Sequence, residues 1–168
     1  SQNESMIPRV IYESNDYKKL QILEVKLVDN SFELISDGII STSQVFCFEV
    51  IYNFKELMPK CHLTYIIKNS LGEVVLFVDR TDFYKQYFVA EAKTYKAVIK
   101  IQNPLLKPGI YYVSFGLADQ YSNSNDHKFD VLKFKIEDLD SIRTSRQGDL
   151  FLPTEWEMKT IQNEENYF

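Results

Sequence analysis

The sequence predicts an all-β fold, an antiparallel two-sheet sandwich of the immunoglobulin-like or jelly-roll kind. Eight or so short segments alternate apolar and polar residues with the two-residue period of a strand, and turn signals separate them. Aromatic residues, which suit strands, are abundant, with 12 Phe and 11 Tyr against only 5 Gly and 5 Pro among 168 residues. No stretch has the period of a long amphipathic helix, so each strand must bury one face against a second sheet.

The length of 168 residues suits one domain with a single core. Residues 1–18 are polar and lack sustained periodicity, which predicts a linker or an edge segment. We expect the sandwich to occupy residues 19–156, and residues 157–168 to form a polar C-terminal tail.

The first expected strands follow from alternation and turn chemistry. Residues 20–28 set Leu and Val on one face against Glu24 on the other, the pattern of a half-buried strand. Residues 32–35 lie between an Asp-Asn-Ser turn and an Asp-Gly turn, which indicates a short strand. Residues 45–53 alternate again, and Glu49 marks the face expected to meet water.

The middle of the chain predicts a hairpin followed by an ambiguous segment. Residues 61–68 and 74–78 are strands joined by the four-residue connection 69–72. Residues 82–95 fit neither period, so a helical turn and an aromatic loop both stay open. Residues 96–101 form a further strand, with lysines alternating against Ala and Ile.

The last strands begin after a Pro-Gly turn. Residues 111–117 have one apolar face, and we expect the Tyr111 hydroxyl to bond to an upstream loop, as a tyrosine in this place does in sandwiches. Residues 129–136 form the next strand after the polar loop 119–127, and residues 150–152 form a short last strand.

Composition and missing motifs exclude several functions. The formal charge of −5, with Lys and Arg scattered among acids, argues against nucleic acid and against an anionic membrane surface. No apolar run is long enough to span a bilayer, so no direct membrane insertion is expected. Cys47 and Cys61 suit buried apolar positions, with a disulfide as the alternative, and the two cysteines and two histidines lack the spacing of a zinc site. We therefore expect no metal and no cofactor.

No nucleophile turn, phosphate loop or helical His pair is present. A carboxylate pair could meet in a cleft, as in a glycosidase, but spacing along the chain does not give the separation that such chemistry requires. The sequence therefore favours a non-catalytic module over an enzyme.

Motifs along most of the chain match a known family in order and spacing. They are Tyr65-Ile-Ile67-Lys-Asn69, Gly72, Val74-Val-Leu-Phe77, Thr81, Leu106-Lys-Pro-Gly-Ile-Tyr111, Ser114, Leu117, Asp126-His127, Asp130, Phe134-Lys-Ile136, Gly148 and Trp156. Over about residues 20–156 the chain resembles the carbohydrate-binding C-terminal domain of Wzt, the ATPase subunit of the ABC transporter that exports O-antigen polysaccharide. Arg80, where the family often has Asn, and the turn at Ser36-Asp37-Gly38 depart from the pattern.

This resemblance implies a cytoplasmic module that recognises the terminus of a specific O-antigen polysaccharide and so licenses its export. The implied partners are this polysaccharide and, in the full-length protein, the transporter's ATPase domain, which this chain lacks, and its membrane subunit. The resemblance also implies a homodimer, often with an exchanged C-terminal strand. Residues 150–152, beyond the polar run 138–147, are the candidate, and folding back onto their own sheet is the alternative.

The residues themselves also predict a sugar site. If the strands near 61–68, 110–118 and 129–136 share a sheet, their outward-facing residues are neighbours. The predicted carbohydrate-binding residues are His62, Thr64, Tyr112, Ser114, Gly116 and Lys133.

A sugar presents hydroxyls and patches of C–H, which match an aromatic platform with short donors and acceptors. Tyr112 is the expected platform, Ser114 and Gly116 would leave the backbone accessible, and His62 and Thr64 would supply hydrogen bonds. Ordinary exposed surface is the alternative for each of these residues.

Other aromatic and polar residues have two interpretations. The aromatic residues of segment 82–95 are expected in packing rather than in ligand stacking. Tyr121, Asp126 and His127 would either rim the site or only turn the chain. As an alternative function, the same face or an open strand edge would dock another protein subunit in an assembly.

Overall fold

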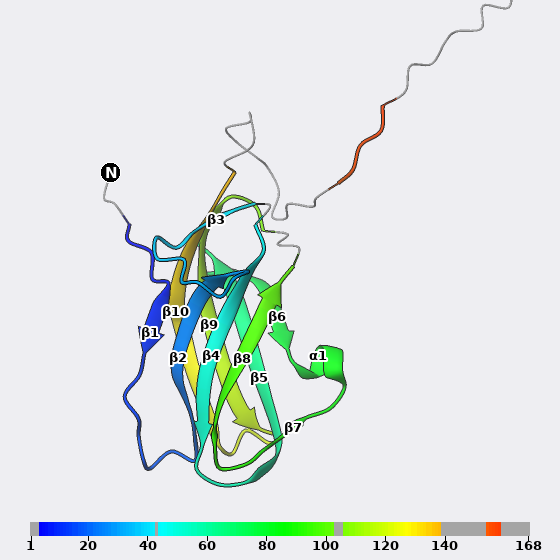
Figure 1. The fold of residues 1–168 in the computed structure, drawn as a ribbon. Helices are drawn as coiled ribbons and strands as arrows, with labels where there is room; N and C mark the ends of the chain where they lie inside the picture. Colours follow the sequence, from blue (N-terminus) through cyan, green and yellow to red (C-terminus); the bar gives the residue numbers. More distant parts are fainter. Residues whose placement is uncertain (1–3, 43, 103–105, 139–153, 159–168) are drawn as a thin grey trace, which may run out of the picture.

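The protein forms two β-sheets packed face to face, with one short helix at the side (Figure 1). The structure is a computed structural model that describes residues 4–42, 44–102, 106–138 and 154–158. Its elements are β1 (Arg9–Ile11), β2 (Leu20–Asp29), β3 (Ile39–Ser41), β4 (Phe46–Phe54), β5 (Met58–Asn69), β6 (Val74–Asp79), α1 (Thr81–Tyr84), β7 (Phe88–Ala90), β8 (Thr94–Ile101), β9 (Gly109–Asp119) and β10 (Asn125–Glu137).

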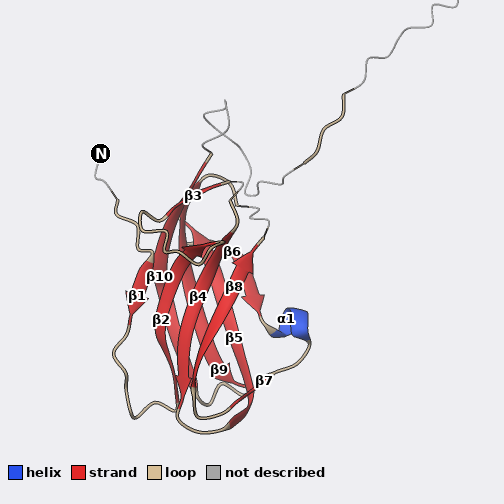
Figure 2. Ribbon diagram, in the orientation of Figure 1, coloured by secondary structure: helices blue, strands red, loops and turns tan. Residues whose placement is uncertain are grey.

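The strand order confirms the predicted sandwich. One sheet, here called the four-stranded sheet, has the order β1-β2-β4-β8. The other, the six-stranded sheet, has the order β3-β10-β9-β5-β6, with β7 also paired to β5 (Figure 2). The three strands expected to share a sheet are therefore neighbours. All pairs are antiparallel except that of β3 with β10.

The core lies between the sheets and is built largely of aromatic rings. Phe48 of the four-stranded sheet makes an edge contact with Phe115 of the six-stranded sheet, with centroids 5.6 Å apart, and a tilted contact with Phe134 at 6.2 Å. Burying each such ring contributes about 1.5–3 kcal/mol. Cys47 and Cys61 are free buried thiols, and burial raises the pKa of both, that of Cys61 to about 11. They serve as small apolar residues, as predicted.

Tyr111 makes the hydrogen bond expected of it. Its hydroxyl donates to the carbonyl oxygen of Lys107 at 2.6 Å, and its ring stacks on Phe134 with centroids 5.6 Å apart. The Pro-Gly turn before β9 is thus tied to the strand that it starts. This confirms that the apolar face of β9 points into the sandwich.

Several details differ from the sequence prediction. Glu49, expected to meet water, is only 2% exposed, and its carboxylate lies 3.2 Å from the Lys26 ammonium. Residues 32–35 form only an isolated antiparallel bridge, Leu34 with Val28 of β2, and no regular strand, because the Asp29 carboxylate accepts the N–H groups of Ser31 and Glu33 and holds the chain in a tight turn.

Residues 82–95, left open between a helical turn and an aromatic loop, contain the helical turn α1 and also β7 and the start of β8, neither of which was predicted. The Arg80 guanidinium lies over the Tyr84 ring of α1 at 4.3 Å.

β10 begins earlier than expected, because residues 125–128 already pair with β9. The pairing shifts between Lys128 and Leu132, and Asp130 adopts a φ of 50° in this bulge. The predicted strand at residues 150–152 lies outside the described residues.

The N-terminal segment runs along one side of the sandwich. Ile7 pairs with Lys133 of the six-stranded sheet, and β1 then pairs with β2 of the four-stranded sheet. Part of the segment 1–18 therefore covers a sheet edge, which protects the edge strands from pairing with other chains.

Candidate functional site

The six predicted sugar-binding residues lie on one surface, the outward-facing side of the six-stranded sheet, here called the outer face. In the register of β5 with β9, His62 is opposite Ala118, Thr64 opposite Gly116, and Lys68 opposite Tyr112. In the register of β9 with β10, Tyr112 is opposite Lys133. Because alternate residues of a strand point to the same side, Ser114 joins this surface.

Gly116 is covered rather than open. A Cβ atom on Gly116 would lie 2.6 Å from Thr64 Oγ1 and 2.8 Å from His127 Nδ1, so these two side chains lean across the glycine from the strands on either side. Thr64 Oγ1 also donates to the Gly116 carbonyl oxygen at 3.4 Å. The expectation of an accessible backbone here is not met, because the space left by the missing side chain is filled by its neighbours.

Ser114 is also covered, with 3% of its surface exposed. Its hydroxyl donates to Asp130 Oδ1 at 3.2 Å and accepts the Asp130 N–H at 2.8 Å. These bonds hold the bulge of β10, and the Asp130 carboxylate in turn lies 3.2 Å from the Lys68 ammonium. Ser114 therefore supports the bulge of β10 and is not itself exposed to a ligand, whereas an accessible sheet surface was expected at this position.

Tyr112 and Lys133 form a partly closed end of the outer face. Lys133 is buried, its ammonium lies 3.4 Å from the Glu4 carboxylate, and it lies 5.5 Å from the centroid of the Tyr112 ring. The backbone of Ile7 runs beside it, with its N–H donating to the Lys133 carbonyl at 2.9 Å. The Tyr112 ring is accordingly half-buried.

The open part of the outer face is centred on two histidines, and we call its residues the histidine site: His62, Thr64, Tyr87, His127 and Phe129. His127 and Phe129 stack, with ring centroids 5.9 Å apart and planes 21° apart, and 69% of Phe129 is exposed. On the other side of Gly116, the Tyr87 ring meets His62 edge-on at 5.9 Å. The five residues thus form a continuous row across β10, β5 and the segment before β7.

Asp79 positions His62. Its Oδ2 lies 2.8 Å from His62 Nδ1, and its Oδ1 accepts both the N–H and the hydroxyl of Thr81. Burial alone would raise the pKa of Asp79, but the bonds from Thr81 and His62 outweigh it, and the pKa lies below its ordinary value. The carboxylate fixes the proton of a neutral His62 on Nδ1, which leaves Nε2 as a hydrogen-bond acceptor.

Sequence reasoning gave no site role to Phe129 or Asp79, expected Tyr87 in packing, and left His127 in a loop that would either rim the site or only turn the chain. The strand period that links His127 to Phe129 is the signal that could have found the stacked pair, had the start of β10 been placed correctly.

Asp126 does not rim the site but points into the sandwich, where 4% of it is exposed. Its carboxylate accepts the Ile22 N–H at 2.7 Å and lies 3.0 Å from Lys18 Nζ and 3.2 Å from Lys128 Nζ. Burial alone would raise its pKa, but these partners outweigh burial, and the pKa of Asp126 lies below its ordinary value. Asp126 is therefore a structural residue that joins the two sheets.

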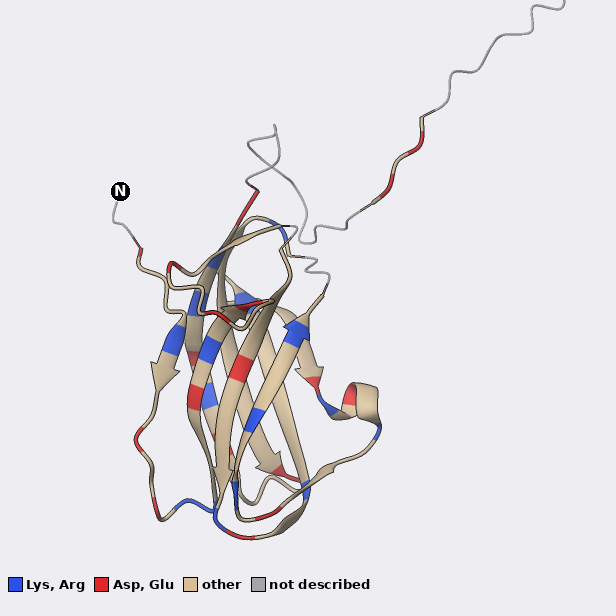
Figure 3. Ribbon diagram, in the orientation of Figure 1, with Lys and Arg blue, Asp and Glu red and all other residues tan. Residues whose placement is uncertain are grey.

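Charge on the described surface is mixed, since Lys and Arg are interspersed with Asp and Glu along the strands (Figure 3). Within the described ranges, no group of three or more His, Cys, Asp or Glu side chains is placed to hold a metal ion. No helix in that part of the chain has the length and apolar character needed to span a membrane.

Comparison with known proteins decides the family. The sequence profile of the Wzt C-terminal domain matches residues 13–148. The chain belongs to the Wzt C-terminal domain family. A crystal structure of the C-terminal domain of Wzt has the same fold, with a TM-score of 0.67 at 11% identity, covering 90% of this chain and 87% of that one.

A second solved structure, the Northeast Structural Genomics Consortium target SoR45, is 12% identical with a TM-score of 0.32, covering 77% of this chain and 95% of that one. A score that low does not establish a shared fold. No curated protein sequence matches the chain. The Wzt C-terminal domain is a non-catalytic, carbohydrate-binding domain of O-antigen export by an ABC transporter.

Proposed function

We propose that this Wzt C-terminal domain recognises the terminus of a specific O-antigen polysaccharide at the histidine site and so licenses its export. The observation that carries the proposal is the exposed Phe129 ring, stacked on His127 next to the hydrogen-bonding groups of His62 and Thr64. An apolar surface with a few convergent polar groups is the usual form of a small-molecule site.

Each group has a role that a sugar ring requires. The C–H face of a pyranose would pack on Phe129, because an exposed aromatic ring offers a flat apolar surface at low entropic cost. A sugar hydroxyl would donate to Nε2 of His62 and another would bond to Thr64 Oγ1. The Asp79 carboxylate is hydrogen-bonded by His62 and Thr81, and Lys68 is paired with Asp130, so neither carboxylate is left without a partner, which favours a neutral sugar.

The remaining predicted residues act in support of the site. Gly116 gives Thr64 and His127 the space to lean together, and Ser114 holds the bulge that presents Phe129. Tyr112 and Lys133 bound the site at the end covered by the N-terminal segment.

Isothermal titration against a panel of bacterial O-polysaccharides tests this proposal. We expect one polysaccharide to bind, and Phe129→Ala and His62→Ala each to weaken binding at least tenfold while the circular dichroism spectrum is unchanged. Tyr17→Ala is the matched control, because Tyr17 is 99% exposed and lies just before β2, a strand of the other sheet. Equal binding by Phe129→Ala and Tyr17→Ala would overturn the placement.

A docking role for another protein subunit is the second candidate, and β6 favours it. This strand lies at the edge of the six-stranded sheet and exposes Val74 and Phe77, 58% and 57% of their surfaces. Phe77→Ser separates the functions, because it would abolish capture of a partner subunit while leaving the affinity for the polysaccharide within twofold.

We also propose that the domain acts in the cytoplasm as a homodimer, with residues 150–152 exchanged between protomers, beside the transporter's ATPase domain and membrane subunit in the full-length protein. Support comes from the family and from the Leu-Phe-Leu sequence beyond a polar run. Sedimentation equilibrium would give a dimer mass for the chain and a monomer mass after truncation at residue 148. A monomeric intact chain would contradict the proposal.

A further inference from the structure

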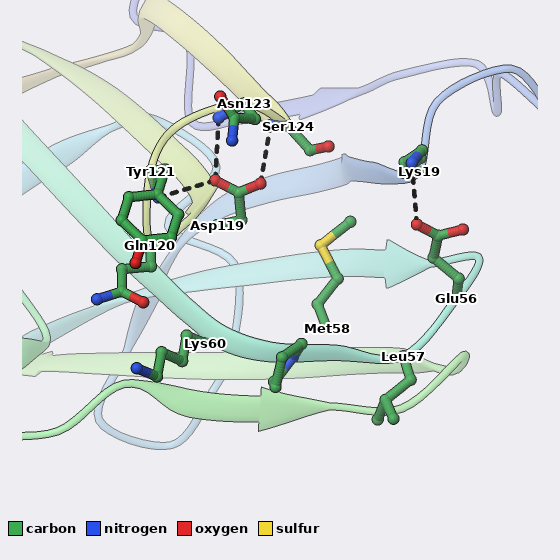
Figure 4. Close-up of a pocket in the computed structure, with 11 residues that line it drawn as sticks. Lys19, Glu56, Leu57, Met58, Lys60, Asp119, Gln120, Tyr121, Asn123 and Ser124 are labelled. Carbon is green, nitrogen blue, oxygen red and sulfur yellow. Dashed lines mark hydrogen bonds and ion pairs between the residues drawn. The ribbon is translucent and has the colours of Figure 1, made fainter.

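A hollow lies at one end of the sandwich, between the loop that leads into β5 and the loop that joins β9 to β10 (Figure 4). Its volume is about 330 Å³, at the small end of the range typical of ligand sites. In the close-up, Met58 lies between the two loops, with Tyr121 on one side and Leu57 on the other. None of the roles given above to the histidine site uses this hollow.

The walls of the hollow are held in place by hydrogen bonds. The Asp119 carboxylate accepts three backbone N–H groups of the following loop at 3.0, 3.0 and 3.1 Å, from Tyr121, Asn123 and Ser124. The Gln120 N–H donates to the Lys60 carbonyl oxygen at 2.9 Å, which joins the two loops. The hollow is thus a preformed feature, and a ligand would not have to order it.

Its chemistry resembles that of a sugar subsite. The Tyr121 ring is 77% exposed and offers an aromatic surface with a hydroxyl. The side chains of Gln120, Tyr121 and Asn123 make no hydrogen bond to other described residues. These groups are therefore available to a ligand that carries both donors and acceptors.

The balance of charge selects a neutral ligand. Lys19 and Glu56 pair with each other at 3.1 Å on the rim. Lys60 and Asp119 are the two other charged residues that line the hollow, one of each sign, so the lining carries no net charge. A lining without net charge offers no electrostatic gain to an anion or a cation, whereas a neutral polyol can exchange hydrogen bonds with its polar side chains.

The hollow also continues the outer face. On β5, Lys60 precedes His62 by two residues, and Gln120 comes two residues after Ala118, the residue opposite His62. Two residues of a strand span ~7 Å, so the hollow begins next to the His62 end of the histidine site. A linear glycan bound over the histidine site would reach it with a neighbouring residue.

We propose that this hollow is a second subsite, which binds a neutral sugar residue of the same polysaccharide with its face on Tyr121. The inference rests on the proposed function of the histidine site. The domain would then bind at least two sugar residues of one glycan. Contacts with the second residue would raise its affinity for longer fragments.

A length series tests the second subsite. The probes are oligosaccharides of one, two and three repeat units, cut from the O-polysaccharide that the wild-type chain binds. The wild type should bind the longer fragments about tenfold more tightly than the shortest, a gain of about 1.4 kcal/mol. Tyr121→Ala should abolish this gain and leave the affinity for the shortest fragment unchanged, whereas Phe129→Ala should weaken binding of all three.

The controls separate this inference from the function on which it rests. Tyr17→Ala should behave as wild type, and Asn123→Ala, in the same exposed loop, should reduce the gain with length. A gain that survives in Tyr121→Ala, or a wild type without any gain, overturns the subsite but not the histidine site. A wild type that binds no O-polysaccharide overturns both.

Discussion

Replacing Asp126 by Asn tests the bond between the two sheets. The amide oxygen of Asn can still accept the Ile22 N–H, so the backbone bond survives, but the negative charge facing Lys18 and Lys128 is lost. The side chain of Lys128 is only 15% exposed, and its ammonium, which also lies over the Tyr12 ring at 4.2 Å, would be left without a counter-ion. Hydrogen bonds between charged groups contribute about 1.5–3 kcal/mol each.

The exposed position of Lys18 reduces the expected loss. Its side chain is 39% exposed, so water can replace much of its interaction with Asp126. This ion pair should therefore contribute less than about 1 kcal/mol to the free energy of unfolding. The expected loss for Asp126→Asn is about 2–3 kcal/mol in the free energy of unfolding at pH 7. Asp16→Asn, at an exposed ion pair with Lys55, is the matched control and should change little.

The effect of Asp126→Asn should depend on pH in one direction. The pKa of Asp126 in the folded protein lies below its ordinary value of 3.8, so its contribution is complete above that value and is lost as the pH falls through the lower folded pKa. The difference between wild type and variant should therefore be largest at neutral pH and vanish in strong acid. A protonated Asp126 then resembles the Asn that replaces it.

Urea unfolding followed by far-ultraviolet circular dichroism at several pH values measures this difference. Fluorescence of Trp156 is unsuitable, because that side chain is 85% exposed and lies beyond the sandwich strands. Equal midpoints for wild type and Asp126→Asn at pH 7 would refute the reasoning, and so would a difference that persists unchanged in strong acid.

Three further predictions concern other residues. Tyr111→Phe removes the bond to the Lys107 carbonyl and should cost about 1 kcal/mol in urea unfolding; an unchanged midpoint would contradict the role given to this hydroxyl. In Gly116→Ala the new Cβ would displace Thr64 and His127, so calorimetry should show an affinity for O-polysaccharide at least tenfold lower. The free energy of unfolding should fall by only about 1 kcal/mol. Undiminished affinity would count against the histidine site. The Cys61 thiol is buried and its pKa is raised to about 11, so it should react with a disulfide reagent at pH 8 only after urea is added. Rapid reaction in the folded protein would contradict this and show that β5 separates from the sheet.

Local patterns predicted much of the fold. The two-residue period and the Pro-Gly turn determine which face of β9 is buried, and the bond from Tyr111 to its upstream loop follows from the same local geometry. The common sheet of β5, β9 and β10 was likewise predictable, because each has one continuous apolar face to bury.

The surface of the site was less predictable, because exposure depends on what neighbouring strands place over a residue. Ser114 and Gly116 point outward as expected, yet Asp130, Thr64 and His127 cover them from adjacent strands. Only the register between strands determines such contacts, and a single sequence does not contain it.

The start of β10 shows the same limit. Treating residues 125–128 as loop concealed the alternation that sends Asp126 into the sandwich and His127 to the outer face. Asp126 and His127 are adjacent in sequence, yet one is a structural residue in the core and the other belongs to the histidine site, because neighbouring residues of a strand point to opposite faces.

Binding of polysaccharide at the histidine site is the central claim, and titration of ¹⁵N-labelled protein with O-polysaccharide fragments tests it most directly. The claim predicts that the largest amide shifts fall on His62, Thr64, His127 and Phe129 of the six-stranded sheet. Shifts confined to β2, β4 and β8 of the opposite sheet, or no shifts with any fragment, would contradict it.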